Sequence, residues 1–196
     1  RKATGADLEQ FLEDDRINAL VIGPGLGRDR DASIRLDAAL ARKLPTVIDA
    51  DALVLLGSSA VPLRQRLKGF AAILTPHEGE FARLFGELPG SRIDRARVAA
   101  RKSGAVVVLK GPDTVVAAPD GRAGIAGSPH FWLSTAGTGD VLSGIIAAMA
   151  ARGLDSFAPA CAGVWLHGEA AGRAGGAMSA DDLVPAVKAV VADISC

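Results

Sequence analysis

The sequence contains no tyrosine, few other aromatic residues and no excess of either charge. Aromatic residues make up 4% of the 196 residues, and 22 lysines and arginines balance 22 aspartates and glutamates, so the formal net charge is zero. Proteins that bind nucleic acid or an anionic membrane usually present a basic face, and this balance argues against both kinds of partner. The longest apolar runs are broken by glycine or charge within about a dozen residues, which is too short to span a bilayer.

Cysteine is also scarce, and its spacing excludes the usual cysteine-based sites. Cys161 and Cys196 are far apart and form neither a CxxC pair nor a zinc-ligand spacing. We therefore expect a protein of the reducing cytoplasm. What the sequence has in quantity is apolar residues, at 49% of the chain. Together with the length, this is enough for one domain with a substantial core.

Short β-branched runs alternate with longer alanine-rich helical patterns, which is typical of βαβ units and of a largely parallel sheet. Four strands are nearly all apolar, as expected where helices cover both faces of a sheet, and a β-hairpin follows them. The predicted strands are residues 19–22, 46–48, 71–74, 105–109, 114–118 and 122–126. The predicted helices are residues 32–43, 78–85, 93–102, 140–151, 156–174 and 181–194.

Glycine and proline cluster where these predicted strands end. The three clusters are residues 23–27, 75–77 and 110–112. In open parallel sheets, ligands bind in the crevice beyond the carboxyl ends of the strands. The three loops therefore indicate one shared binding site.

The strongest single signal is the string STAGTGDVLSG, residues 134–144, which runs directly into an apolar helix. Gly137 and Gly139 allow the backbone to approach a ligand closely. The free N–H groups at the start of the helix form an anion-binding cradle suited to a phosphoryl group. Asp140 follows in the first turn, where it either complements the helix dipole or takes a proton from an attacking hydroxyl.

Several motifs together resemble the ADP- or ATP-dependent NAD(P)H-hydrate dehydratases, a family of the ribokinase-like superfamily. In order they are VIGPGLGRD (21–29), VIDADAL (47–53), TPHEGEFARL (75–84), KGPDT (110–114) and TAGTGDVLSG (135–144). The resemblance spans essentially the whole chain and implies a three-layer α/β/α sandwich with a largely parallel central sheet. It also implies repair of hydrated NAD(P)H, in which a nucleotide phosphorylates the hydroxyl of the hydrate and loss of phosphate restores the dihydronicotinamide. ADP or ATP is then the co-substrate, with Mg²⁺ bridging its phosphates.

The resemblance also implies roles for individual residues. Asp140 corresponds to the catalytic base and contacts the substrate. The implied nucleotide-binding residues are Lys110, Gly111, Pro112, Asp113, Thr114, Gly137, Thr138 and Gly139. The implied contacts to the hydrated nicotinamide are Gly25, Gly27 and His77.

Each of these side chains also has a simpler interpretation. His77 could only cap a helix, and Lys110 could be a solvated cation at a strand end. Asp49 and Asp51 could cap the next helix; acidic groups in this region lie near Mg²⁺ in related kinases, and the sequence does not decide between the two. His167 falls in mid-helix, which favours a packed position over a catalytic one.

Three other functions compete with the dehydratase interpretation. A dinucleotide-binding Rossmann unit would need glycine where Arg28 stands. A small-molecule kinase of the same fold would use the same Asp140 but release a phosphorylated product. A non-catalytic nucleotide-binding remnant is the third alternative.

The sequence departs from the family pattern in two places. Members carry a further βα region before the first strand of this chain, so a single domain over residues 1–196 is expected to lack that portion. Its absence would leave a sheet edge that a homo-oligomer partner could cover. Residues 127–133, GSPHFWL, carry two aromatics and a histidine where the family has small residues and Asn-Pro.

Overall fold

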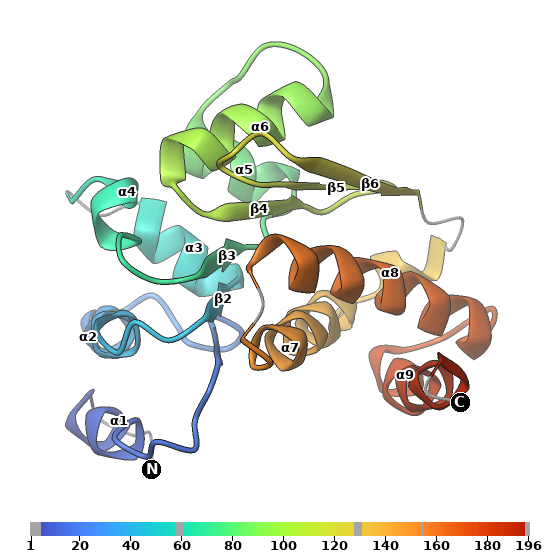
Figure 1. The fold of residues 1–196 in the computed structure, drawn as a ribbon, viewed down its shortest axis with the longest axis horizontal. Coiled ribbons are helices and arrows are strands. Elements are labelled where there is room, and N and C mark those ends of the chain that lie inside the picture. Colours follow the sequence, from blue (N-terminus) through green and yellow to red (C-terminus); the bar gives the residue numbers. More distant parts are fainter. Residues whose placement is uncertain (1–4, 58–60, 128–130, 154, 195–196) are drawn as a thin grey trace.

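The computed structural model describes residues 5–57, 61–127, 131–153 and 155–194, which form a mixed α/β fold (Figure 1). The strands are β1 (Leu20–Ile22), β2 (Thr46–Ile48), β3 (Ala72–Leu74), β4 (Val106–Leu109), β5 (Asp113–Ala117) and β6 (Ala123–Gly127). The helices are α1 (Gly5–Phe11), α2 (Arg30–Ala41), α3 (Ala50–Gly57), α4 (Leu63–Arg66), α5 (Glu78–Phe85), α6 (Arg92–Ser103), α7 (Thr138–Ala150), α8 (Phe157–Ala174) and α9 (Ala180–Ile194), with a 3₁₀ turn, η1, at Phe131–Ser134.

The strands lie in the sheet in the order in which they occur along the chain. β1 to β4 are parallel, and the β5–β6 hairpin continues the sheet in antiparallel fashion. The carboxyl ends of the four parallel strands therefore meet at one edge of the sheet. The glycine- and proline-rich clusters follow β1, β3 and β4 there, and Asp49 follows β2.

Two apolar cores lie on opposite faces of the sheet, because successive side chains of a strand point to opposite sides. Ile48, Leu74 and Val107 belong to the core shared with α2, α3, α5 and α6. Val47, Ile73 and Val106 belong to the core shared with α7 and α8. α9 packs against α8 (Figure 1). The arrangement is the predicted three-layer α/β/α sandwich.

All six predicted strands and all six predicted helices are present, with ends that differ by at most two residues. The sequence did not predict α1, α3, α4 or η1. α3 follows β2 so directly that the apolar run of residues 52–56 gives no polar face by which to recognise a helix. Among the described residues, none of the helices combines the length and the hydrophobicity needed to cross a membrane.

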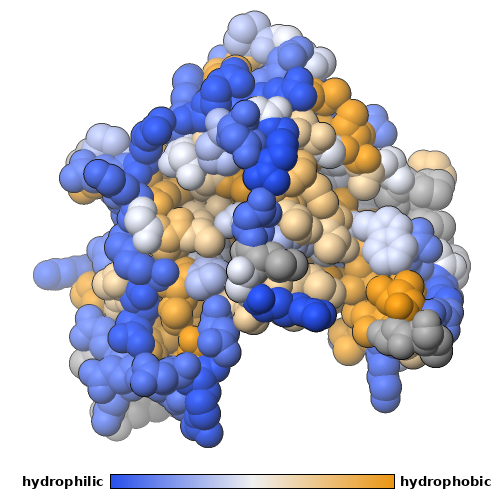
Figure 2. Space-filling view, in the orientation of Figure 1, coloured by the Kyte–Doolittle hydropathy of each residue, from blue (hydrophilic) through white to orange (hydrophobic). Residues whose placement is uncertain are grey.

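The expectation that all four parallel strands are covered on both faces was wrong for β1. Val21 lies on the side of the sheet that carries α7 and is 40% exposed, whereas its neighbour Val47 in β2 is fully buried. β1 pairs only with β2 within the described sheet. Figure 2 shows the molecule hollowed between the α1–α2 projection and the α9 projection, on the β1 side. A homo-oligomer that covers this edge stays a prediction.

Candidate active site

A cleft of about 600 Å³ lies beyond the carboxyl end of β4, between the β4–β5 loop, the start of α7 and the middle of α8. Its volume is in the range of small-molecule sites. The residues that line it include the motif residues His77, Lys110, Gly111, Pro112, Thr114, Thr138 and Gly139. A second hollow, with Arg64, Lys68 and Phe70 in its lining, lies near the amino ends of the strands and contains no motif residue.

The start of α7 has the backbone form that an anion-binding cradle needs. Gly137 precedes the helix in the left-handed conformation, at φ 87° and ψ −17°, and makes no side-chain cap. The hydroxyl of Thr138 lies 2.7 and 2.8 Å from the carbonyl oxygens of Leu133 and Thr135, which share its one proton, and this fixes the turn before the helix. At the start of α7, the N–H groups of Thr138 and Asp140 donate to the carbonyls of Thr135 and Gly137, at 3.3 and 3.1 Å. The Gly139 N–H has no hydrogen-bond partner among the described residues and is left for a ligand, with the positive end of the helix dipole behind it.

A buried ion pair connects this cradle to the centre of the sheet. Asp49, directly after β2, is 1% exposed, and its carboxylate accepts hydrogen bonds from Lys110 Nζ at 2.8 Å and Ser143 Oγ at 2.7 Å. The same ammonium lies 3.4 Å from the position that a Cβ on Gly139 would take. Lys110 is therefore no solvated strand-end cation: Asp49 holds its positive charge beside the N-terminus of α7.

Backbone conformation at two positions keeps Asp49 in place. Ala50 has φ +46°, which a residue with a side chain seldom adopts, and its N–H donates to the Asp49 carboxylate at 2.9 Å. Gly23, after β1, has φ +138°, and a Cβ there would lie 1.7 Å from the carbonyl oxygen of Asp49. The glycine-rich loop after β1 thus serves close packing against the end of β2. Strained backbone of this kind is common at functional sites.

His167 supports the cradle from α8. It is 7% exposed, lines the cleft, and its Nε2 lies 2.9 Å from the carbonyl oxygen of Thr138. A carbonyl only accepts, so Nε2 carries the proton. Burial lowers the pKa of His167 from 6.5 to about 4. The hydrogen bond to Thr138 opposes this shift, and the charge of Lys110 adds to it. His167 is therefore a neutral donor at pH 7; it is packed, as the sequence predicted, but it also contacts the predicted anion site.

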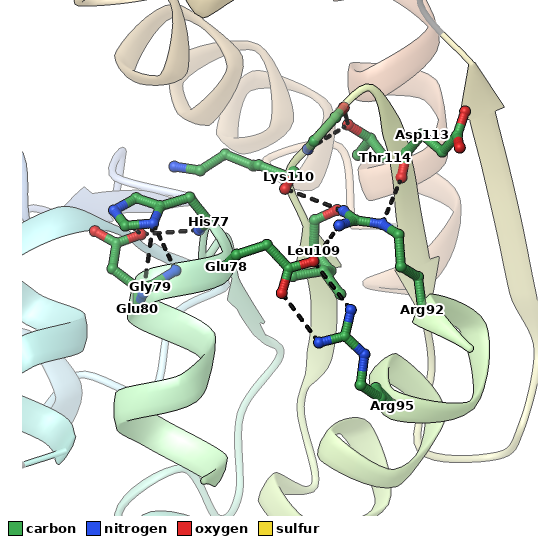
Figure 3. Close-up of polar contacts among 11 residues, drawn as sticks. His77, Glu78, Gly79, Glu80, Arg92, Arg95, Leu109, Lys110, Asp113 and Thr114 are labelled. Atoms are coloured by element: carbon green, nitrogen blue, oxygen red, sulfur yellow. Dashed lines mark hydrogen bonds and ion pairs between the residues drawn. The ribbon is translucent and has the colours of Figure 1, made fainter. Parts of the chain in front are cut away.

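His77 is both a helix cap and a cleft residue. Its Nδ1 accepts from the N–H groups of Gly79 and Glu80, at 3.0 and 3.4 Å, while the Glu80 carboxylate accepts from the His77 N–H at 2.9 Å (Figure 3). This reciprocal capping box fixes the imidazole at the start of α5. Because Nδ1 accepts, the neutral ring carries its proton on Nε2. The side chain remains 59% exposed beside the cleft.

The loop of residues 110–114 closes on itself beside the cleft. The hydroxyl of Thr114 donates to the Gly111 carbonyl at 3.0 Å, and the nitrogen of Gly111 lies 3.4 Å from that hydroxyl oxygen of Thr114. Pro112 also lines the cleft, whereas Asp113 is exposed and does not. Four of the five residues that the sequence assigned to nucleotide binding in this loop thus line the cleft.

The remaining predicted residues lie outside the lining of the cleft. Gly25 and Gly27 belong to the β1–α2 loop, where the Gly27 N–H donates to Asp51 Oδ2 at 3.0 Å. The hydrogen bond from Arg28 to Asp51 lowers the pKa of that carboxyl group. With strands spaced about 4.8 Å apart, this loop lies roughly 14 Å along the sheet edge from the end of β4. Asp140 follows the cleft residue Gly139 and is exposed.

A family model described as NAD(P)H-hydrate dehydratase matches residues 3–188 of the chain. The chain belongs to this family. It is 42% identical over 186 residues to the ADP-dependent (S)-NAD(P)H-hydrate dehydratase of Neisseria meningitidis, and covers 62% of that protein with 88% of its own length. It is 42% identical over 171 residues to the bifunctional NAD(P)H-hydrate repair enzyme Nnr of Mycobacterium leprae, of which it covers 35% with 87% of its own length.

Solved structures agree with this assignment to the NAD(P)H-hydrate dehydratase family. The ADP/ATP-dependent NAD(P)H-hydrate dehydratase of Bacillus subtilis, co-crystallized with ATP/Mg²⁺, superposes with a TM-score of 0.72 and 31% identity, over 92% of this chain and 69% of that one. A hydroxyethylthiazole kinase from Pyrococcus horikoshii gives a TM-score of 0.71 at 21% identity over 93% of this chain and 74% of that one, which shows the shared ribokinase-like fold.

The acidic side chains of the described residues are not grouped as a metal site would require. Within the described ranges, no group of three or more histidine, cysteine or acidic side chains could hold a metal ion. Asp49 is occupied by Lys110 and Ser143, and Asp51 by Arg28 and Gly27. Neither is therefore placed as a free Mg²⁺ ligand, whereas the exposed Asp140 side chain makes no hydrogen bond or ion pair with another described residue.

Two exposed aromatic side chains form a rim at the cleft, one of them from the segment of residues 127–133. Phe131, 91% exposed, lines the cleft together with Trp165 of α8, which is 47% exposed. Residues 128–130 lie outside the described part of the chain. Large exposed aromatic side chains at a cleft offer faces on which a flat ring can stack.

Proposed function

We propose that this domain catalyses the ADP- or ATP-dependent dehydration of hydrated NAD(P)H. The observation that carries the proposal is the position of the Lys110 ammonium, held by Asp49 and 3.4 Å from the Cβ position of Gly139 at the start of α7. A cation, a helix N-terminus and glycines without side chains form a site for a transferring phosphoryl group. The family shared with the Neisseria and Bacillus dehydratases supports the choice of substrate.

In the proposed reaction, Asp140 accepts the proton of the substrate hydroxyl as its oxygen attacks the terminal phosphorus of the nucleotide. The bond between that phosphorus and its bridging oxygen breaks, and the shortened nucleotide leaves. Lys110 and the Gly139 N–H at the start of α7 stabilise the charge on the transferring group. The phosphorylated hydrate then loses phosphate, with the C–O electron pair, and a ring proton, which restores the dihydronicotinamide.

The substrate and the nucleotide would occupy different parts of the sheet edge. The loop of residues 110–114, the cradle at residues 137–139 and the rim at Phe131 and Trp165 surround the nucleotide. His77, Gly25 and Gly27 follow β3 and β1, on the side away from the hairpin, and would contact the hydrated nicotinamide. Mg²⁺ would enter with the phosphates and neutralise part of their charge, and the exposed carboxylate of Asp140, next to the cleft residue Gly139, could hold it there.

A kinase of the same fold is the second candidate, and product analysis separates the two. With hydrated NADH and either nucleotide, a dehydratase releases one phosphate for each NADH formed. A kinase consumes the nucleotide but accumulates a phosphorylated hydrate without recovery of NADH absorbance. Accumulation of that phosphorylated product, with no free phosphate, would refute the dehydratase assignment.

A further inference from the structure

Arg92, the first residue of α6, contacts the backbone of the loop of residues 110–114 and does not itself line the cleft. Its guanidinium donates to three carbonyl oxygens of this region: Leu109 at 3.2 Å, Lys110 at 3.1 Å and Asp113 at 3.3 Å. It also forms an ion pair with Glu78, the first residue of α5 (Figure 3). The Arg92 side chain is only 26% exposed.

These contacts fix more than the carbonyl groups they reach. In a trans peptide the C=O and the following N–H point in opposite directions. When Arg92 holds the Lys110 carbonyl, it also sets the direction of the Gly111 N–H, which is next to the Thr114 hydroxyl. Gly111 lies so close that a Cβ there would be 2.5 Å from a terminal nitrogen of Arg92.

Glu78 links the same guanidinium to the other side of the cleft. Glu78 follows His77, which lines the cleft. Its carboxylate also accepts two hydrogen bonds from a second arginine, Arg95, at 3.0 and 3.1 Å. Among the described residues, Arg95 donates hydrogen bonds to Glu78 but none to the loop, whereas Arg92 bonds to both (Figure 3). A planar guanidinium with five donors can serve several acceptors at once, which a lysine ammonium at the end of a flexible chain cannot.

We propose that Arg92 is a positioning residue that holds the loop of residues 110–114 in its nucleotide-binding form. It acts through the backbone of Lys110 and Asp113 and does not touch the ligand. The inference rests on the proposed function in one respect, namely that the ligand of this loop is ADP or ATP. Arg95 supplies a matched control, because it shares the ion pair with Glu78 but not the carbonyl contacts.

The test compares Arg92→Lys with Arg95→Lys by calorimetric titration with ADP. Loss of fixed charged hydrogen bonds to the loop should weaken ADP binding by about tenfold or more in Arg92→Lys. The Arg95→Lys variant should bind ADP within about twofold of the parent chain, since lysine substitutions at partly exposed ion pairs change little. In turnover assays the KM for the nucleotide should rise more in Arg92→Lys than kcat falls. Equal ADP affinity in the two variants would overturn the inference.

A second substitution keeps the test decisive if Arg92→Lys folds poorly, as circular dichroism would show. Gly111→Ala places a methyl group where the Arg92 guanidinium lies, and it should weaken ADP binding to a similar extent. Where both single variants fold and both act by displacing that guanidinium, the double variant binds ADP no more weakly than the worse single variant. Fully additive losses would mean that Gly111→Ala perturbs the ligand directly, and would contradict the proposed coupling.

The outcome separates this inference from the proposed reaction, because ADP binding is measured without turnover. An Arg92 effect on ADP affinity without recovery of NADH would refute the dehydratase and leave the role of Arg92. Recovery of NADH with equal ADP affinity in the two lysine variants would do the reverse.

Discussion

At the scale of single residues, the proposed chemistry depends on Asp140. We expect Asp140→Asn to lower kcat by about 10²–10⁴-fold, the usual effect of losing a general base. Nucleotide affinity should persist, because removing a negative charge beside phosphate does not weaken binding. Steady-state kinetics with ADP titrations measure both quantities. A variant that retains the parent kcat would show that another group accepts the proton.

His167 gives the domain a specific dependence of stability on pH. Its folded-state pKa of about 4 lies below the ordinary 6.5, so the unfolded chain binds more protons between these values. The free energy of unfolding should therefore fall as pH drops from about 6.5 to 4, by roughly 3 kcal/mol from this residue. Urea denaturation at several pH values measures it, with His167→Gln as the comparison. If that variant shows the same slope between pH 6.5 and 4, His167 is not the source.

The sequence predicted the motif residues better than the residues that support them. Lys110, Thr138, Gly139 and His77 line one cleft, as the motifs indicated. The buried pair of Asp49 with Lys110 joins residues 61 positions apart, and no local pattern reveals such a contact. Arg92 likewise reads as an ordinary residue of a charged helix, because its carbonyl partners come from another part of the chain.

At the scale of elements, the loop after β1 shows how the sheet edge is assembled. Gly23→Ala would combine a left-handed backbone, at roughly 1–2 kcal/mol, with overpacking against the Asp49 carbonyl, at roughly 1–3 kcal/mol. Gly69→Ala is a matched control, since Gly69 also has a positive φ of +91° but a Cβ there meets nothing within 4 Å. Denaturation curves should show a clearly larger loss for Gly23→Ala. Equal losses would mean that the close approach to Asp49 carries no energetic weight.

Most elements could be predicted because their patterns are local. The strands β3 and β4 are uninterrupted apolar runs, and α5 begins at a capping box. The exposure of Val21 could not be predicted in this way. An apolar residue in a strand indicates a potential for burial, and only the arrangement of neighbouring elements decides whether it is covered.

At the scale of the whole molecule, the ribokinase-like fold places four loops at one sheet edge. β1 to β4 run in parallel, so the segments that follow them all lie at the same edge of the sheet. α7, which packs on the face opposite to α2, α3, α5 and α6, brings the cradle of residues 137–139 to that edge. The alternation of strands and helices predicted this arrangement. Whether this domain acts alone or as an oligomer is a separate prediction, which sedimentation would test.

The most direct measurement is the recovery of NADH absorbance from purified hydrated NADH, with ADP, with ATP and with neither. The proposed function predicts recovery only when a nucleotide is present, with one phosphate released for each NADH and loss of the signal in Asp140→Asn. If thermal denaturation shows that the domain binds ADP or ATP but NADH absorbance does not return with either, this chain is not a dehydratase.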